Sequence, residues 1–153
     1  MPSLVGSEMC IRDRANRVRE FVWNTFAPHY VEMVKARAYK AGFDEEGQMA
    51  AWSTLHTCLK TILKLIAPIT PFITDHIWRQ LYGDRSIHLE RFPEPIWDKS
   101  LTQYTEKIIE FNSMVWNMKK SMGRSLKEPI DVEIPDDLRS FESDLRAMHN
   151  IRP

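Results

Sequence analysis

The sequence has few of the residues that build metal, redox or membrane sites. It contains two cysteines in 153 residues, Cys10 and Cys58, which can form neither a disulfide framework nor a Cys-x-x-Cys pair. Its five histidines lie in five different segments, and no two have the i, i+4 spacing that places two metal ligands on one helix face. No apolar run approaches the ~20 residues that span a bilayer. We therefore expect no metal site, no membrane segment and a reducing compartment, the cytoplasm.

Signals for catalysis are also missing. The five glycines are scattered, so no glycine-rich loop is available to hold a phosphate group. No serine stands in a Gly-x-Ser-x-Gly turn, and the acidic pairs Glu45/Glu46 and Asp136/Asp137 are placed as helix-start acids. The sequence therefore predicts no catalytic residue and no cofactor for this chain. Cations and anions number 21 each, so a nucleic-acid partner would have to bind a local basic patch.

What is present is a chain of ordinary globular composition whose apolar residues follow a helical period. Hydrophobic residues make up 43% and charged residues 27%, which excludes disorder throughout. Apolar residues recur at intervals of three and four over 15–41, 44–68, 71–83, 100–123 and 136–148, whereas 84–97 and 130–134 have an extended pattern. This predicts an all-α helical bundle over 15–122, followed by a small C-terminal appendage over 123–153 that contains a short extended arm.

Prolines and capping residues mark the predicted helix boundaries. Pro28 lies inside the first helix and predicts a kink or break near Asn24. Asp44 is a predicted side-chain cap of the second helix, and Thr70 followed by Pro71 is the predicted start of the third.

The first fourteen residues, MPSLVGSEMCIRDR, differ from the rest. They show no helical or alternating period, and they resemble the translated adaptor sequence found at the ends of some gene models from environmental sequencing. We expect residues 1–14 to be a disordered or artefactual N-terminus.

Basic and aromatic residues gather in the first predicted helix. Residues 14–40 hold six cations against two anions, and residues 112–128 hold four against one. The rings of Trp23, Phe26, Tyr30 and Tyr39 interleave with these cations, as in proteins that stack unpaired bases on aromatic rings at ~1 to 3 kcal/mol each. An aromatic stripe at this spacing also fits a hydrophobic core, and the pattern alone leaves both interpretations open.

Three stretches together resemble a known family. They are FAPHYVEMVK at 26–35, LIAPITPFITDHIW at 65–78 and SIHLERFP at 86–93. In this order they are similar to the anticodon-binding domain of the valine, isoleucine and leucine group of class I aminoacyl-tRNA synthetases, with a likeness over residues 15–151. The resemblance implies a helical bundle that binds the anticodon stem-loop of a tRNA. Pro28 and His29 replace the family's commoner acidic and aromatic pair, so we expect a local difference in the backbone there.

Two C-terminal stretches indicate which synthetase of the group this chain resembles most. Residues 119–127, KKSMGRSLK, and 144–151, DLRAMHNI, are most similar to valyl-tRNA synthetases of the archaeal type. The adenylation signatures His-x-Gly-His and Lys-Met-Ser-Lys-Ser do not occur here. The resemblance thus implies a C-terminal fragment, whose absent catalytic domain would use ATP and Mg to charge valine tRNA. The alternatives are the same domain of an isoleucyl- or leucyl-tRNA synthetase, a helical protein-interaction module without RNA binding, and a standalone enzyme.

Correspondence with the family suggests site residues. Tyr30 is the predicted base-stacking residue, with His29 beside it. The candidates for contacts with the tRNA backbone are cations of the two basic stretches: Lys35, Arg37, Lys119, Lys120 and Arg124. Phe72, Ile73 and Trp78 are predicted to pack in the core.

Overall fold

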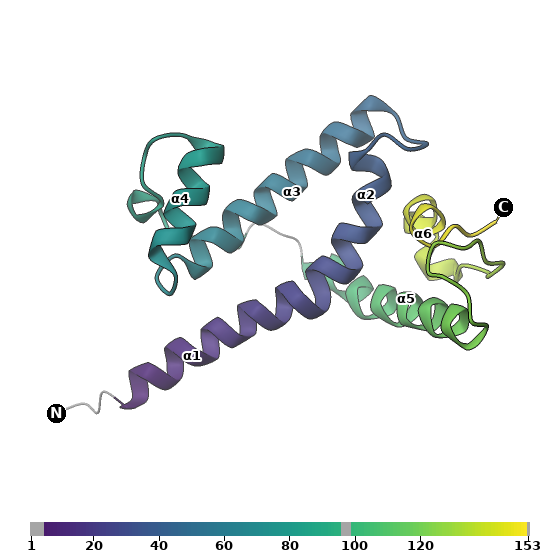
Figure 1. The fold of residues 1–153 in the computed structure, drawn as a ribbon, viewed down its shortest axis with the longest axis horizontal. Helices are drawn as coiled ribbons and strands as arrows, with labels where there is room; N and C mark the ends of the chain where they lie inside the picture. The colour runs from purple at the N-terminus through teal and green to yellow at the C-terminus, as the bar shows by residue number, and fades with distance from the viewer. Residues whose placement is uncertain (1–4, 96–98, 153) are drawn as a thin grey trace. The chain divides into compact units, whose positions relative to one another are not determined.

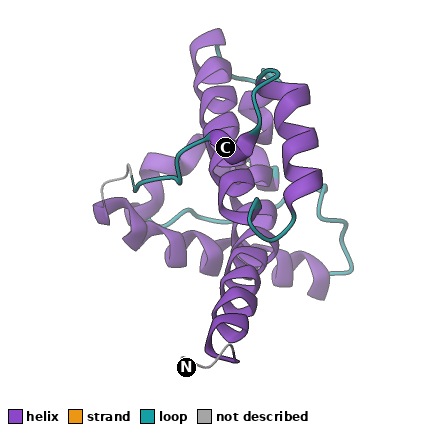
Figure 2. Cartoon of the chain, turned by 90° about the vertical axis from the view of Figure 1, so that its left-hand side faces the viewer, coloured by secondary structure: helices purple, strands orange, loops and turns teal. Residues whose placement is uncertain are grey.

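The computed structural model describes residues 5–95 and 99–152, with side chains over 12–95 and 101–152. Within these ranges helices are joined by loops, and there is no β-strand (Figures 1 and 2). The predicted all-α class is confirmed. The elements are α1 (Val5–Glu20), the π-helix η1 (Phe21–Val31), α2 (Glu32–Ala38), α3 (Glu45–Ile66), α4 (Pro71–Tyr82), the 3-10 turns η2 (Ile87–Leu89) and η3 (Lys99–Thr102), α5 (Gln103–Ser121), the 3-10 helix η4 (Asp136–Phe141) and α6 (Glu142–His149).

The N-terminal helix begins earlier than predicted, and its predicted interruption is longer than one kink. Helix α1 begins at Val5, so residues 5–14 are helical although they lack an apolar period. A helix that has nucleated downstream extends at little cost, and beyond Gly6 this stretch contains no glycine or proline. Pro28 does interrupt the α-helix, as predicted. The interruption extends over all 11 residues of η1, the wider π-helix whose N–H groups bond five residues back.

Two of the predicted boundary features have the expected local chemistry, and one does not. Asp44 Oδ1 accepts a hydrogen bond of 2.8 Å from a backbone N–H in the first turn of α3. Helix α4 begins with Pro71 and ends before Gly83, whose φ of 117° favours glycine. The predicted Thr70 cap is wrong, because its hydroxyl donates back to Ile66 O at 3.3 Å.

The connection predicted as extended over 84–97 contains a single helical turn. Ser86 precedes η2, and its hydroxyl accepts a hydrogen bond from His88 N at 3.3 Å. Residues 91–95 have no regular structure, as their prolines require. Residues 96 and 97 lie outside the described ranges.

The chain divides into two compact units, each built from two stretches of sequence. Unit 1 comprises Met1–Asn24 and Ser53–Ile96, and unit 2 comprises Thr25–Trp52 and Trp97–Pro153. This division differs from the predicted bundle over 15–122 with an appendage over 123–153. The reason is that residues 130–151 contribute to the same hydrophobic core as α2 and α5.

Unit 1 has a small core at the junction of α3, α4 and η2. Its buried members are Leu63, Ala67, Trp78 and Ile87. Trp78 is therefore in the core, as predicted. Phe72 is 90% exposed and Ile73 is 54% exposed, so their predicted core positions are wrong. They lie outside the stripe formed by Trp78 and the buried Thr74, one helical turn apart.

Asp75 ties α4 to the turn that follows it. Its Oδ1 accepts hydrogen bonds from Ser86 Oγ at 2.6 Å and from Ile87 N at 3.0 Å, while Oδ2 accepts one from Arg79 Nε at 2.7 Å. The bonds from Ser86 and Arg79 lower the pKa of the Asp75 carboxyl to about 2. The carboxylate thus fixes η2 against α4.

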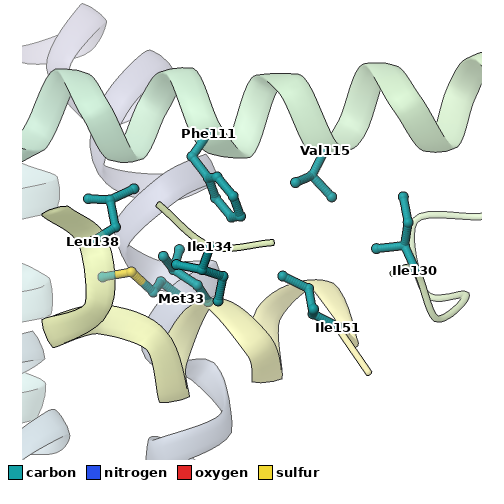
Figure 3. Close-up of a cluster of buried hydrophobic side chains, with 8 residues drawn as sticks. Met33, Phe111, Val115, Ile130, Ile134, Leu138 and Ile151 are labelled. Atoms are coloured by element: carbon teal, nitrogen blue, oxygen red, sulfur yellow. The ribbon is translucent and has the colours of Figure 1, made fainter. Parts of the chain in front are cut away.

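Unit 2 has the larger core. Figure 3 shows Phe111 and Val115 projecting from α5 toward residues of α2, η4 and the C-terminal segments. The buried members are Met33, Phe111, Val115, Ile130, Ile134, Leu138, Leu145 and Ile151. Helix α6 packs against α2. The predicted arm over 130–134 is extended, and it forms one isolated parallel bridge between Ile130 and Ile151.

No helix in the described ranges is both long and apolar enough to cross a membrane. The same ranges contain no cluster of three or more His, Cys, Asp or Glu side chains that could hold a metal ion. Candidate sites must therefore be sought among pockets and charged surfaces.

Candidate functional site

Tyr30, the predicted stacking residue, lines a small pocket. The pocket lies in unit 2 between η1 and α5 and has a volume of about 100 Å³. Its lining is almost entirely apolar and consists of Thr25, His29, Tyr30, Met33, Thr105, Ile108 and Ile109. Sites for drug-sized ligands occupy about 300 to 1,000 Å³, so this pocket is too small to enclose such a ligand.

The Tyr30 ring is held in place by its neighbours. Phe26, one turn earlier in η1, is stacked on it with ring centroids 5.5 Å apart and planes 22° apart. Tyr30 is half-buried and packs against the core of unit 2. A fixed aromatic ring at the edge of an apolar pocket can stack on an unpaired base without a large entropic cost.

His29 is directed into the protein rather than toward solvent. It is buried, its Nδ1 accepts a hydrogen bond from Asn112 Nδ2 at 3.1 Å, and its ring lies 5.1 Å from that of Trp116. Burial lowers the pKa of His29, which keeps the imidazole neutral near pH 7. His29 thus lines the pocket beside Tyr30 but has little surface open to solvent, and its predicted contact with RNA stays a prediction.

Lys119 is also buried, against the prediction. It is 0% exposed, and its Nζ donates hydrogen bonds to Leu126 O and His149 O, both at 2.7 Å. The His149 ring donates from Nε2 to Asn112 Oδ1 at 2.7 Å, with the tautomers of both histidines assigned from these bonds. Burial, followed by the charges of Lys119 and His29, lowers the pKa of His149 to about 4. We therefore remove Lys119 from the set of phosphate contacts.

The two candidate cations of α2 have different surroundings. Lys35 is exposed and pairs with Glu32 at 2.5 Å, one turn away on the same helix. Arg37 donates from Nε and Nη2 to the two carboxylate oxygens of Asp144, at 2.5 and 2.8 Å, and its guanidinium lies 4.7 Å from the Phe43 ring centroid. The Asp144 hydrogen bond raises the pKa of Arg37. Arg37 thus joins α2 to α6, and its planar fork is already occupied.

Lys120 and Arg124 lie at the end of α5 and in the loop after it. Both side chains are exposed, and so is that of Lys127. Among the described residues, no carboxylate pairs with any of the three. We call Lys120, Arg124 and Lys127 the basic loop. Exposed cations that no carboxylate neutralises are available to phosphate groups, although Arg124 also donates from Nη1 to Pro129 O at 3.4 Å.

Comparison with known proteins identifies the family. Residues 7–134 match the family model described as "Anticodon-binding domain of tRNA ligase". The chain belongs to this family. The match confirms the resemblance carried by the motifs at 26–35, 65–78 and 86–93.

Relatives of this anticodon-binding domain are similar over nearly its whole length. Three proteins named "Valine--tRNA ligase" come from Aeropyrum pernix, Pyrobaculum aerophilum and Nanoarchaeum equitans, and they are 42%, 41% and 35% identical to it. The alignments cover 93%, 95% and 90% of this chain but 18%, 19% and 18% of those proteins. The chain therefore spans about a fifth of the length of its relatives. No solved structure matches it.

Sequence reasoning missed three residues that organise the anticodon-binding domain in unit 2: Asn112, Asp144 and His149. Asn112 gave a readable signal, because it stands beside Phe111 on the apolar face of α5, where a polar side chain needs a partner. The partners themselves come from segments up to 107 residues away in sequence, which no local pattern could reveal.

Proposed function

We propose that this domain binds the anticodon stem-loop of valine tRNA as part of a valine–tRNA ligase. The observation that carries the proposal is the match of residues 7–134 to the anticodon-binding model, combined with relatives of 31–42% identity that are named as ligases for valine. The archaeal-type tail motifs support the same choice of amino acid.

The charging reaction belongs to the part of such a ligase that this chain does not contain. The chain spans about a fifth of its relatives and has neither adenylation signature, so valine, ATP and Mg would bind elsewhere in the ligase. The partners we propose are therefore valine tRNA and the catalytic domain of the same ligase, acting in the cytoplasm. Exposed apolar side chains of unit 1, such as Phe72 and Phe92, offer a surface for that second contact.

Within unit 2, separate residues would bind the base and the phosphates. Tyr30 would stack on an unpaired base at its pocket. Phosphate oxygens would be met by Lys35 and by the basic loop, that is, by Lys120, Arg124 and Lys127. We leave out Arg37, because a phosphate would have to displace the carboxylate of Asp144.

A binding titration tests the proposal. The 153-residue chain is titrated with valine, isoleucine and leucine tRNAs at several salt concentrations. We expect tightest binding to valine tRNA, with log K falling as log[salt] rises by about 0.7 to 0.9 per phosphate contact. Preference for isoleucine or leucine tRNA would assign the domain to the corresponding ligase. Equal, salt-insensitive retention of all three would overturn RNA recognition and leave a protein-interaction module.

Tyr30→Leu tests the stacking residue. Leucine keeps apolar contact with the core but has no ring, so binding to valine tRNA should weaken by about 1 to 3 kcal/mol while the melting temperature changes little. Tyr30→Phe, which keeps the ring, is the matched control and should bind almost like the original domain. Equal binding by the leucine and phenylalanine variants would show that the ring serves only the core.

A further inference from the structure

We propose that Lys119 is a positioning residue. Its buried ammonium fixes the loop after α5 beside the end of α6, so that the exposed cations of the basic loop contact RNA phosphates together. The inference rests on the proposed RNA binding and assigns a role to a cation that cannot itself reach the RNA. Every contact it uses lies within unit 2.

Burying the Lys119 ammonium does not by itself favour folding, because the charge loses its contact with water. The residue follows Phe111 and Val115 along α5 at intervals of four, so it occupies the apolar face of the helix at 0% exposure. Among the described residues no carboxylate lies within ion-pair distance of its ammonium, and burial lowers its pKa. An apolar side chain of similar volume would fill this position at a lower desolvation cost. The ammonium therefore contributes through what it holds.

It holds two backbone carbonyls from different segments. Lys119 Nζ donates to Leu126 O, in the loop after α5, and to His149 O, in the last turn of α6, both at 2.7 Å. Asn150 adds a second tie next to the first, because its Nδ2 donates to Lys127 O at 2.8 Å. Leu126 and Lys127 are thus anchored side by side, two and three residues after Arg124.

The same contacts continue to the pocket beside Tyr30. The ring of His149 is bonded to Asn112, and Asn112 is bonded to His29, the neighbour of Tyr30 in η1. A continuous chain of hydrogen bonds therefore joins the basic loop to the helix that carries the stacking ring. Fixed spacing between a ring and a group of cations lets one RNA hairpin engage both without reordering the protein.

Two variants loosen the loop in different ways. Lys119→Met keeps a long side chain and removes the ammonium. Asn150→Gly removes the side-chain tie but suits the left-handed backbone of Asn150, whose φ is 51°. It serves as the second variant if Lys119→Met does not fold. Asn117→Ala, at an exposed position on α5, is the matched control.

Two measurements are made on each folded variant: amide hydrogen exchange over residues 124–130, and affinity for valine tRNA as a function of salt. We expect Lys119→Met and Asn150→Gly to speed exchange in this segment by about tenfold or more, while exchange in α5 changes little. The salt slope should fall by about 1.4 to 1.8, because Arg124 and Lys127 lose their phosphate contacts together. Arg124→Ala alone should lower the slope by about half as much; its Nη1 also donates to Pro129 O at 3.4 Å, so its effect on exchange is read against that of Asn117→Ala, which should change neither quantity.

The outcomes separate this inference from the proposed function. Unchanged exchange in the loop, or faster exchange with an unchanged salt slope, overturns the positioning role. If the unmodified domain binds no tRNA at any salt concentration, the proposed function fails and the RNA part of the inference fails with it. The exchange data then still decide whether Lys119 orders the loop.

Discussion

The two units are stabilised in different ways, although both are helical. Unit 1 has a core of four buried apolar residues. Near the surface, the carboxylate of Asp75 connects α4 to the segment of η2 by hydrogen bonds. Unit 2 has a core cluster of eight buried apolar residues and, beside it, a chain of buried polar groups formed by His29, Asn112, His149 and Lys119. Buried polar chains of this kind fix one arrangement of the segments they connect, at the cost of removing those groups from water.

The difference gives the units different responses to acid. The pKa of Asp75 is lowered to about 2, so the stability it contributes is complete above its usual value near 3.8 and is lost as pH falls through 2. The pKa of His149 is lowered to about 4 from 6.5, so the unfolded state takes up a proton first and stability falls as pH drops from 6.5 to 4. Acid should therefore weaken unit 2 before unit 1.

Trp78→Ala should have the largest effect and should test how far unit 1 depends on one side chain. Trp78 is the largest residue of the four-member core, and its truncation should destabilise unit 1 by about 3 to 5 kcal/mol. Hydrogen exchange in α4 is the measurement, and exchange in α5 is the internal reference. Protection in α4 close to that of the original chain would mean that the small core is not what stabilises unit 1.

Lowering the pH from 6.5 to 4 should reduce the free energy of unfolding of unit 2 by about 3 kcal/mol through His149 alone. The full shift applies because the His149 side chain is only 1% exposed. The lowered pKa of His29 adds in the same direction. Urea unfolding followed by exchange in α5 and α6 measures this loss, and α4 should keep its protection over the same range.

His149→Gln is the matched variant for the pH experiment. Glutamine can donate a hydrogen bond to Asn112 but does not titrate, so most of the pH dependence of unit 2 should disappear. If the variant retains the full slope between pH 6.5 and 4, the acid response comes from another group and the contrast between the units loses its cause.

Phe72→Ser should have the smallest effect. Because the ring is 90% exposed, its removal should change the free energy of unfolding by no more than about 0.5 kcal/mol. Thermal unfolding of the variant and of the original domain measures this difference. The same substitution should reduce any docking of the remainder of the ligase when it is supplied as a separate chain. A large loss of stability in the isolated domain would show that Phe72 is covered after all.

Much of the fold could be predicted because its boundaries depend on local chemistry. Pro71 and Gly83 limit α4 through their own backbone preferences, and Asp44 caps α3 within one turn. Pro28 predicted a distorted helix but not its type or its length, since the π-helix begins at Phe21, seven residues before the proline.

The candidate site was less predictable, because exposure depends on distant segments. Lys119 and Lys120 are neighbours with the same charge, yet one is buried and the other exposed. The helical period alone places Lys119 on the face of Phe111 and Val115, but only the folded chain brings the carbonyls of Leu126 and His149 to its ammonium. The pattern of rings and cations led to Tyr30, whose role in binding stays a prediction.

The order of the stretches along the chain has a consequence for synthesis on the ribosome. The first stretch of unit 2 ends at Trp52 and the second begins at Trp97. Hydrogen bonds between the two stretches join residues 83 positions apart, in His29–Asn112, and 107 positions apart, in Arg37–Asp144. The contacts of α3, α4 and η2 span 26 positions or fewer, as in His56–Tyr82 and Lys64–Glu90. Short loops close faster, and translation supplies them first. The nascent polypeptide can thus complete the inner segment while residues 25–52 still await α5 and α6, so the apolar side chains of that stretch stay in contact with water until the rest of unit 2 has been synthesised.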